Sequence, residues 1–287
     1  MRNVQKSQYY AKMRSKSVHH RPDLDLSKLS SHKDRDRGTH KHRRPNKRHT
    51  IGSKSAGRRG RVKTPRSTYI ANCKELGVSP DARIIVGTDM QTYFNFAQAG
   101  CSADQVLALI MALGECKSAI VEVLNISTNN FSNMDLTKII STLRVDEIIS
   151  LDLSNNTFGN SVAVELRDLI LNDISSLQDI NLCGVSLRRT QLKTLNAAFF
   201  RSKSLRRLHL GRNKIDDQMA DGLLAALRNS NVEDLDLSWN NICTTASRFL
   251  ECPQLKWLNL EMNAIKKGCE KAWSDALMRN TSLLYLD

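Results

Sequence analysis

The sequence predicts an α/β solenoid in which short parallel strands alternate with helices, preceded by a disordered basic tail. Three observations predict this fold class. A frame of apolar residues with one asparagine recurs along the chain, and its period leaves room for a strand and a helix. The excess of positive charge is confined to the N-terminal part of the chain.

The recurring frame is clearest at residues 232–242, V-E-D-L-D-L-S-W-N-N-I. Leu235 and Leu237 alternate with polar residues, as in a strand with one buried face, and Asn240 follows at a fixed offset. This frame is the leucine-rich repeat pattern. The asparagine recurs in other frames as Asn129, Asn156, Asn213 and Asn263, and is expected to satisfy buried turn backbone groups.

The spacing of the frames predicts the helices. Equivalent positions lie 27–30 residues apart, apart from one unit of 23 residues that ends at Leu258. Amphipathic stretches predict helices at 162–171, 191–200, 219–227 and 272–278, and another capped by Ser102. The short unit has room at 245–250 for only a turn or two. Strands about 4.8 Å apart beside helices about 10 Å wide predict a horseshoe with a concave parallel sheet and convex helices.

An N-terminal helical cap is expected at residues 68–92. Ser67 or Thr68 is suited to cap a helix that ends near Leu76, where Gly77 provides a left-handed stop. Solenoids need terminal caps, because each repeat buries only part of its own core.

The leucine-rich repeat domain is expected at residues 93–287, with about eight units of which the last is incomplete. The last frame stops in mid-strand at Leu286. An uncapped end of this kind predicts either fraying after about residue 278 or self-association. A truncated gene product explains the same observation.

Residues 1–67 are predicted to form a disordered basic tail. Residues 1–66 hold 21 Lys/Arg and 4 Asp/Glu, a charge of +17, whereas residues 67–287 carry −3. So few apolar residues cannot offset the entropy of ordering. The basic clusters suit a polyanion such as nucleic acid or an acidic protein surface, and equally a solvated tail without a specific partner. The candidate polyanion contacts are Arg43, Arg44, Lys47, Arg48, Arg58, Arg59, Arg61 and Lys63.

The candidate binding surface is the concave face, where side chains alternate with the buried leucines. Its candidate residues are Ser150, Asp152, Asp179, Asn181, Arg207, His209, Asp234, Asp236, Trp257, Asn259, Glu261 and Tyr285. Trp257 is the leading anchor, because an exposed tryptophan within a sheet is typical of a binding hot spot. Arg207 and His209 beside Asp234 and Asp236 fit either a ladder of opposite charges or a site. Asp236 is interpreted as an ordinary residue of the frame.

No catalytic, metal or cofactor site is expected. The chain has no H-E-x-x-H, G-x-S-x-G or paired-cysteine spacing, and residues 52–58 lack the Lys-Ser/Thr ending of a phosphate loop. The seven cysteines are scattered, which predicts free thiols in a reducing compartment. No apolar run reaches the length of a membrane span. A non-enzymatic protein of the cytoplasm is therefore expected.

The repeat period, the frame and the connecting residues 213–227 resemble those of ribonuclease-inhibitor-like leucine-rich repeat proteins. The resemblance covers residues 93–287, with departures at Val185, in the short unit and at the C-terminal end. The opening Y-x-x-x-C-x-x-x-G-V-x-P, from Tyr69 to Pro80, is similar to the cap of cytoplasmic and flagellar members. This resemblance implies a non-catalytic protein-binding scaffold, with the cytoskeleton or a flagellum as one setting.

Two alternatives stay open at this point. Some members of the class activate Ran, so the resemblance also implies a regulator of a Ran-like small GTPase, although no motif in this sequence carries that role residue by residue. The basic tail leaves open a nuclear protein that binds nucleic acid.

Overall fold

The structure, a computed structural model, describes residues 63–87, 92–116 and 120–287. Its strands form one eight-stranded parallel sheet in sequential order. The strands are β1 (Tyr93–Asn95), β2 (Val123–Asn125), β3 (Ser150–Asp152), β4 (Asp179–Asn181), β5 (Arg207–His209), β6 (Asp234–Asp236), β7 (Trp257–Asn259) and β8 (Tyr285–Leu286). All candidate tail contacts except Lys63 lie outside the described residues.

Helices alternate with these strands. They are α2 (Pro65–Glu75), α3 (Ala82–Gly87), α4 (Ala103–Glu115), α5 (Asn133–Thr142), α6 (Asn160–Leu171), α7 (Arg189–Arg201), α8 (Asp217–Leu227) and α9 (Glu270–Arg279), with the 3-10 helix η2 (Ala246–Glu251) in the short unit. The predicted α/β leucine-rich repeat solenoid is thus confirmed, and the short unit has only the turn that its length allows.

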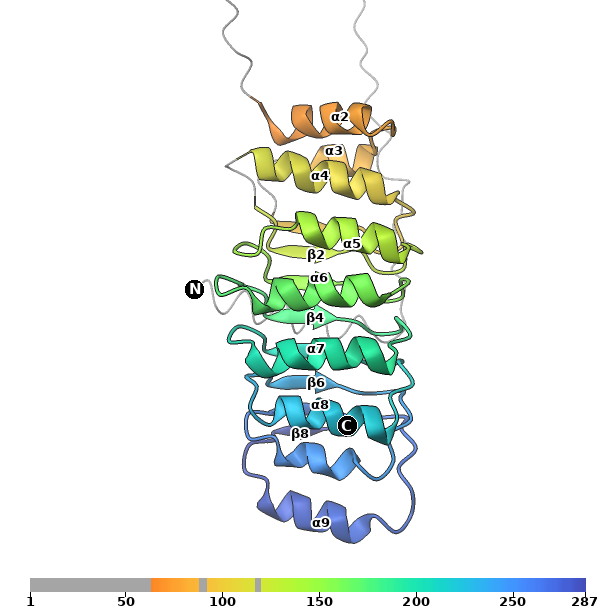
Figure 1. Cartoon of the computed structure of the whole chain (residues 1–287), viewed down its shortest axis with the longest axis vertical. Helices are drawn as coiled ribbons and strands as arrows, with labels where there is room; N and C mark the ends of the chain where they lie inside the picture. The colour runs from red at the N-terminus through yellow and green to blue at the C-terminus, as the bar shows by residue number, and fades with distance from the viewer. Residues whose placement is uncertain (1–62, 88–91, 117–119) are drawn as a thin grey trace, which may run out of the picture. The chain divides into compact units, whose positions relative to one another are not determined.

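The helices α4 to α8 stack over one face of the sheet (Figure 1). The middle residue of a strand points to the helices, and the middle residues of neighbouring strands are in register, as with Leu208 and Leu235. Both leucines are fully buried. Burial of one such side chain contributes about 1.5–3 kcal/mol, so the register of the sheet is fixed by its apolar column. The opposite face, here called the sheet face, carries the first and third residues of the strands.

The asparagine column joins each turn to the turn before it. The Asn240 amide nitrogen donates to the carbonyl oxygens of Leu237 at 2.9 Å and of Leu210, one unit earlier, at 3.0 Å. The Asn240 Oδ1 accepts from the backbone N–H groups of Asn213 at 3.0 Å and Ile215 at 2.9 Å. The structural role predicted for this column is therefore confirmed.

Val185 replaces asparagine in the unit of β4 and is buried. Its side chain has no hydrogen-bonding group, so it cannot accept from the turn of Asn156 in the unit before. The column resumes at Asn213, whose Oδ1 accepts from the N–H of Leu187 at 3.1 Å. At this junction a different amide makes the link, because Gln191 of α7 donates to the carbonyl oxygen of Phe158 at 3.2 Å.

The N-terminal cap begins earlier than predicted. The helix α2 starts at Pro65, and Thr64 rather than Ser67 or Thr68 is its N-cap, with its side chain accepting from the N–H of Ser67. Proline at the first helical position favours this start, because its fixed φ suits a helix and its missing N–H is not needed there. Gly77 has φ of +69°, as the predicted left-handed stop requires.

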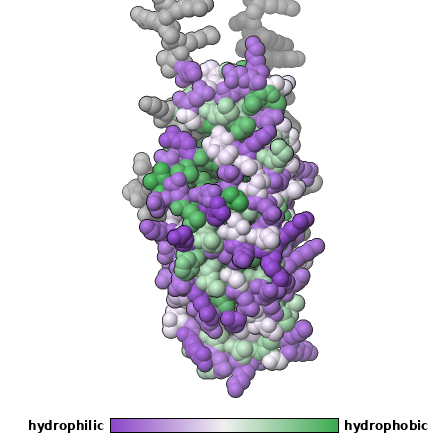
Figure 2. Space-filling model, in the orientation of Figure 1, coloured by the Kyte–Doolittle hydropathy of each residue, from purple (hydrophilic) through white to green (hydrophobic). Residues whose placement is uncertain are grey.

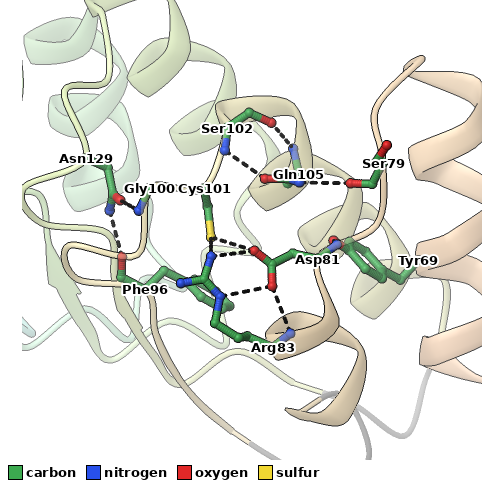
Figure 3. A network of polar contacts seen from close by, with 10 residues as sticks. All are labelled: Tyr69, Ser79, Asp81, Arg83, Phe96, Gly100, Cys101, Ser102, Gln105 and Asn129. Carbon is green, nitrogen blue, oxygen red and sulfur yellow. Dashed lines mark hydrogen bonds and ion pairs between the residues drawn. The ribbon is translucent and has the colours of Figure 1, made fainter.

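A polar network ties the cap to the first unit (Figure 3). Asp81 accepts from the Arg83 Nε at 3.0 Å and donates its backbone N–H to the Tyr69 hydroxyl at 3.0 Å. The hydrogen bond from Arg83 lowers the pKa of Asp81 to about 2. Gln105 of α4 donates to the Ser79 carbonyl at 2.8 Å. These contacts close the N-terminal end of the apolar core.

Lys63, the last basic residue of the candidate tail contacts, is also tied to this end. Its Nζ lies 3.0 Å from Glu115 Oε2, and the pKa of Lys63 is raised by this hydrogen bond and charge. Both side chains are well exposed, so the pair contributes little to stability.

The short unit lacks a full helix, and the carboxylate of Asp217 orders its turn. From the N-terminus of α8 its carboxylate accepts from the backbone N–H groups of Cys243 at 2.8 Å, Thr244 at 3.0 Å and Thr245 at 3.1 Å. Burial opposes ionisation of Asp217, but these hydrogen bonds outweigh it and lower its pKa to about 2. The carboxylate thus orders the turn that leads into η2.

The helical face is mainly polar, with apolar residues interspersed (Figure 2). Exposed apolar residues on or beside its helices include Met134, Val164 and Phe200. At the other end of the repeats, α9 has no buried residue, and Leu277, Met278 and Ile265 are exposed. The last unit therefore leaves much of its apolar surface open.

Candidate protein-binding face

The predicted binding residues lie together on the sheet face. Those of β3 to β8 occupy the first and third positions of their strands, and Glu261 follows β7. The flanking positions of the inner strands are half-buried while the middle position is buried, as the burial of β5 and β6 illustrates. Backbone hydrogen bonds on both sides hold these side chains in fixed rows. The face is therefore a preformed surface of polar and aromatic groups.

A cluster of charges occupies the middle of this face. Arg207 Nε lies 2.9 Å from Asp179 Oδ2, and His209 Nε2 lies 3.5 Å from Asp179 Oδ1. Asn181 donates to Asp152 Oδ2 at 3.0 Å. The sequence interpretation placed Arg207 and His209 beside Asp234 and Asp236, with which they are in register. The ion pairs above are instead with Asp179 of the preceding strand, which the sequence interpretation had not paired with either cation.

The cluster shifts the pKa values of its members. Burial alone would disfavour the charged form of Asp179, but the hydrogen bond and charge of His209 and the charge of Arg207 outweigh burial and lower the pKa of Asp179. Burial likewise opposes the charging of His209, yet Asp179, with Asp236 and Asp152, raises the pKa of the imidazole. The side chains of Asp179, Arg207 and His209 are only 14–29% exposed. Their charges are therefore little screened by water, and each holds the others in place.

The third residue of β3, β4, β6 and β7 also shapes the turn that follows its strand. Asp236 Oδ1 accepts from the N–H of Ser238 at 2.9 Å, and Asp152 Oδ1 accepts from Ser154 at 2.9 Å. Asn181 and Asn259 make the equivalent contact with their amide oxygens. Asp236 has the structural role in the repeat that the sequence interpretation gave it. Its side chain is half-buried and hydrogen-bonded to the turn, so it is more than a surface charge.

The aromatic residues lie toward the last strands. Trp257 is half-buried rather than exposed as expected, and it lies in register between Asp234 and Tyr285 of the neighbouring strands. Tyr285 is 65% exposed. The face therefore changes from charged groups at β4 and β5 to carboxylates and aromatic rings at β6 to β8.

The sequence interpretation missed Trp239. It lies in the turn after β6, 48% exposed, and the guanidinium of Arg212 lies 4.9 Å from its ring centroid. Both residues have positive φ, 55° for Trp239 and 60° for Arg212. Bulky side chains at a left-handed position are uncommon and costly. A tryptophan directly before the frame asparagine was therefore the feature of the sequence that could have indicated an exposed, functional ring.

Among the residues that the structure describes, no group of three or more His, Cys, Asp or Glu is placed to hold a metal ion. Burial, followed by the charge of Asp236, raises the pKa of the Cys183 thiol to about 12, so the thiol stays protonated near neutral pH. The described helices include none with the length and apolar character needed to cross a membrane.

Comparison with known proteins finds similarity among solved structures. No family model and no curated protein matches the chain. Among solved structures, the C-terminal domain of tropomodulin from Caenorhabditis elegans is similar, at 18% identity and a TM-score of 0.40, over 43% of this chain and 80% of that chain. The repeat architecture of the present chain follows from its own strand register and asparagine column.

Proposed function

We propose that this protein is a non-catalytic scaffold that binds a protein partner on its sheet face. The observation that carries the proposal is the set of polar and aromatic side chains on β3 to β8, which are half-buried on β3 to β7 and include the paired Arg207, His209 and Asp179. A surface that is already ordered loses little entropy on binding, which favours affinity.

We also propose that the chain belongs to the ribonuclease-inhibitor-like class. The full helices of 11–13 residues in α6, α7 and α8 support this proposal. We also propose, from the sequence, that the protein meets its partner in the cytoplasm, at the cytoskeleton. Co-fractionation of the tagged full chain with the detergent-insoluble cytoskeleton tests that setting, and a freely extractable protein contradicts it.

The test of the proposed function compares aromatic truncations on the two faces of the full chain. Trp257→Ala and Tyr285→Ala should each weaken capture of the partner, with a cost of about 2 kcal/mol for a true hot spot. The matched control is Phe200→Ala, which removes a half-exposed ring from α7 on the helical side. Circular dichroism confirms that each variant is folded. Equal capture by all variants would place the binding surface elsewhere.

A further inference from the structure

We propose that the end of the sheet face formed by β6, β7 and β8 recognises a basic side chain, arginine or lysine, in an extended segment of the protein partner. The inference rests on the proposed function and names the chemistry of the partner. It is carried by the carboxylates of β6 and by the aromatic rings of β7 and β8, which lie side by side in the sheet.

The sheet face has an excess of carboxylates over cations. Asp152, Asp179, Asp234 and Asp236 lie at strand positions of this face, against Arg207 and His209. Asp179 contacts both cations, and Arg207 and His209 also lie in register with Asp234 and Asp236 of β6. Two cations are thus shared among four carboxylates, and with the exposed Glu261 after β7 the β6 to β8 end keeps an excess of negative charge.

The two carboxylates of β6 have capacity for a cation. Asp236 uses Oδ1 for the N–H of Ser238, and an ionised carboxylate has further lone pairs available. Asp234 also takes part in an interaction within the protein, which an incoming cation shares or replaces. Both residues are half-buried, and partial removal from water strengthens their attraction for a positive charge.

The aromatic rings complete the site. Trp257 lies in register with Asp234 on one side and Tyr285 on the other, and neighbouring strands are about 4.8 Å apart. A guanidinium or ammonium bound to Asp234 is therefore within reach of a ring face, where cation–π attraction adds about 0.5–2 kcal/mol. Arg212 over Trp239, on the adjacent turn, is an internal example of the same contact.

Other partner chemistries fit this end of the face less well. An acidic segment meets repulsion from Asp234, Asp236 and the exposed Glu261. A purely apolar segment would remove water from half-buried carboxylates without supplying hydrogen bonds, which is costly. A basic segment supplies both the charge for the carboxylates and a planar or compact cation for the rings.

The experiment measures binding of three acetylated, amidated octapeptides to the full chain by calorimetry. Glycine alternates in them with arginine, glutamine or glutamate. The arginine peptide should bind, more weakly as salt is added, and the glutamine and glutamate peptides should not. Comparable binding of the three peptides would overturn the inference.

Site variants locate the binding. The double variant Asp234→Asn/Asp236→Asn should lower the affinity for the arginine peptide by about tenfold or more. Asparagine occupies the position of Asp236 in β4 and β7 and makes the same turn contact there, so this change removes charge and keeps the turn. The matched control is Asp168→Asn, which alters an exposed carboxylate on α6 and should leave binding unchanged. An unchanged affinity in the double variant contradicts the assignment.

The outcomes separate this inference from the proposed function. If the asparagine double variant retains the natural partner while Trp257→Ala and Tyr285→Ala lose it, the sheet face binds protein but does not select a basic side chain. If none of these variants alters capture of the partner, the proposed function itself fails.

Discussion

Asn240 shows how one amide holds two units together. Its two ends contact carbonyl and N–H groups of its own turn and of the turn before it, and its side chain is 4% exposed. Such buried backbone groups have no access to water, so loss of the amide leaves them without partners. Asp236, in the same unit, makes a single contact with the turn, and asparagine can reproduce it.

Replacement of Asn240 by alanine should therefore lower the free energy of unfolding by about 1–3 kcal/mol or more. The control Asp236→Asn should change it by no more than about 0.5 kcal/mol. Both values come from urea titration followed by circular dichroism. If the two substitutions had equal effects, the amide would not be holding the turns.

The charge pair on the sheet face predicts a pH dependence at His209. The groups that face it are Asp179 on β4, Asp152 on β3, Asp236 on β6 and Arg207 on its own strand. Because the folded-state pKa of His209 is raised, its stabilising effect is full below the unfolded value of about 6.5 and is lost as pH rises through the folded value.

Asp179→Asn should lower the pKa of His209, measured by NMR titration of the imidazole in the full chain. His209→Gln should remove the part of the stability that disappears as pH rises through the folded pKa. An imidazole pKa that does not respond to Asp179→Asn would show that the ion pair is not the cause.

At the scale of single elements, the unit after β6 replaces an α-helix by η2. A shorter connection leaves fewer residues to satisfy the turn, and the carboxylate of Asp217 takes over this role for three successive N–H groups. A residue of α8 thereby fixes the geometry of the following unit. The position of η2 depends on this contact as well as on its own buried Phe249 and Leu250.

Asp217→Ala should destabilise the protein by about 1–3 kcal/mol, the cost of unsatisfied turn donors. Because its folded pKa of about 2 is below the unfolded value, the stabilisation by Asp217 is present above about pH 4 and is lost as pH falls toward 2. Acid unfolding of the wild type and of Asp217→Ala should therefore converge at low pH. Asp221→Asn, at an exposed partner of Arg248, is the control and should change stability by at most about 0.5 kcal/mol.

At the scale of the whole molecule, the repeat frame predicted the fold. The spacing of apolar residues alone sets the register of the strands and the face of the sheet that the helices cover. The sheet-face residues followed from the same alternation. The contact of Asp179 with Arg207 and His209, in contrast, depends on side-chain rotamers across two strands. The exposed ring of Trp239 depends on a left-handed turn conformation that a bulky residue rarely adopts. The ranges of α3 and α5 were not predicted. The six residues of α3 are too few for a clear period, whereas the capping box of Ser132 with Asp135 and the buried Leu136, Ile139 and Ile140 were a usable signal for α5.

The apolar surface of the last unit predicts concentration-dependent association. Ile265, Leu277, Met278 and Leu284 are 40–75% exposed, and exposed apolar residues that lie together favour association with another chain. Sedimentation of the full chain should show mass increasing with concentration, and Leu277→Lys should suppress the increase. The control Ile174→Lys alters an exposed residue between α6 and β4 and should have no effect. A monomer at all concentrations would contradict the prediction.

Val185 has a consequence for how the units of the solenoid are linked. On one side of it the turns of Asn129 and Asn156 are joined by amides, and on the other side those of Asn213, Asn240 and Asn263 are joined in the same way. The side chain of Val185 forms no such bond, so the units of β3 and β4 are linked differently: Gln191 of α7 donates its amide N–H to the carbonyl oxygen of Phe158 at 3.2 Å. Loss of the Gln191 amide would therefore weaken the link between these two units, beside the charged cluster of β4 and β5.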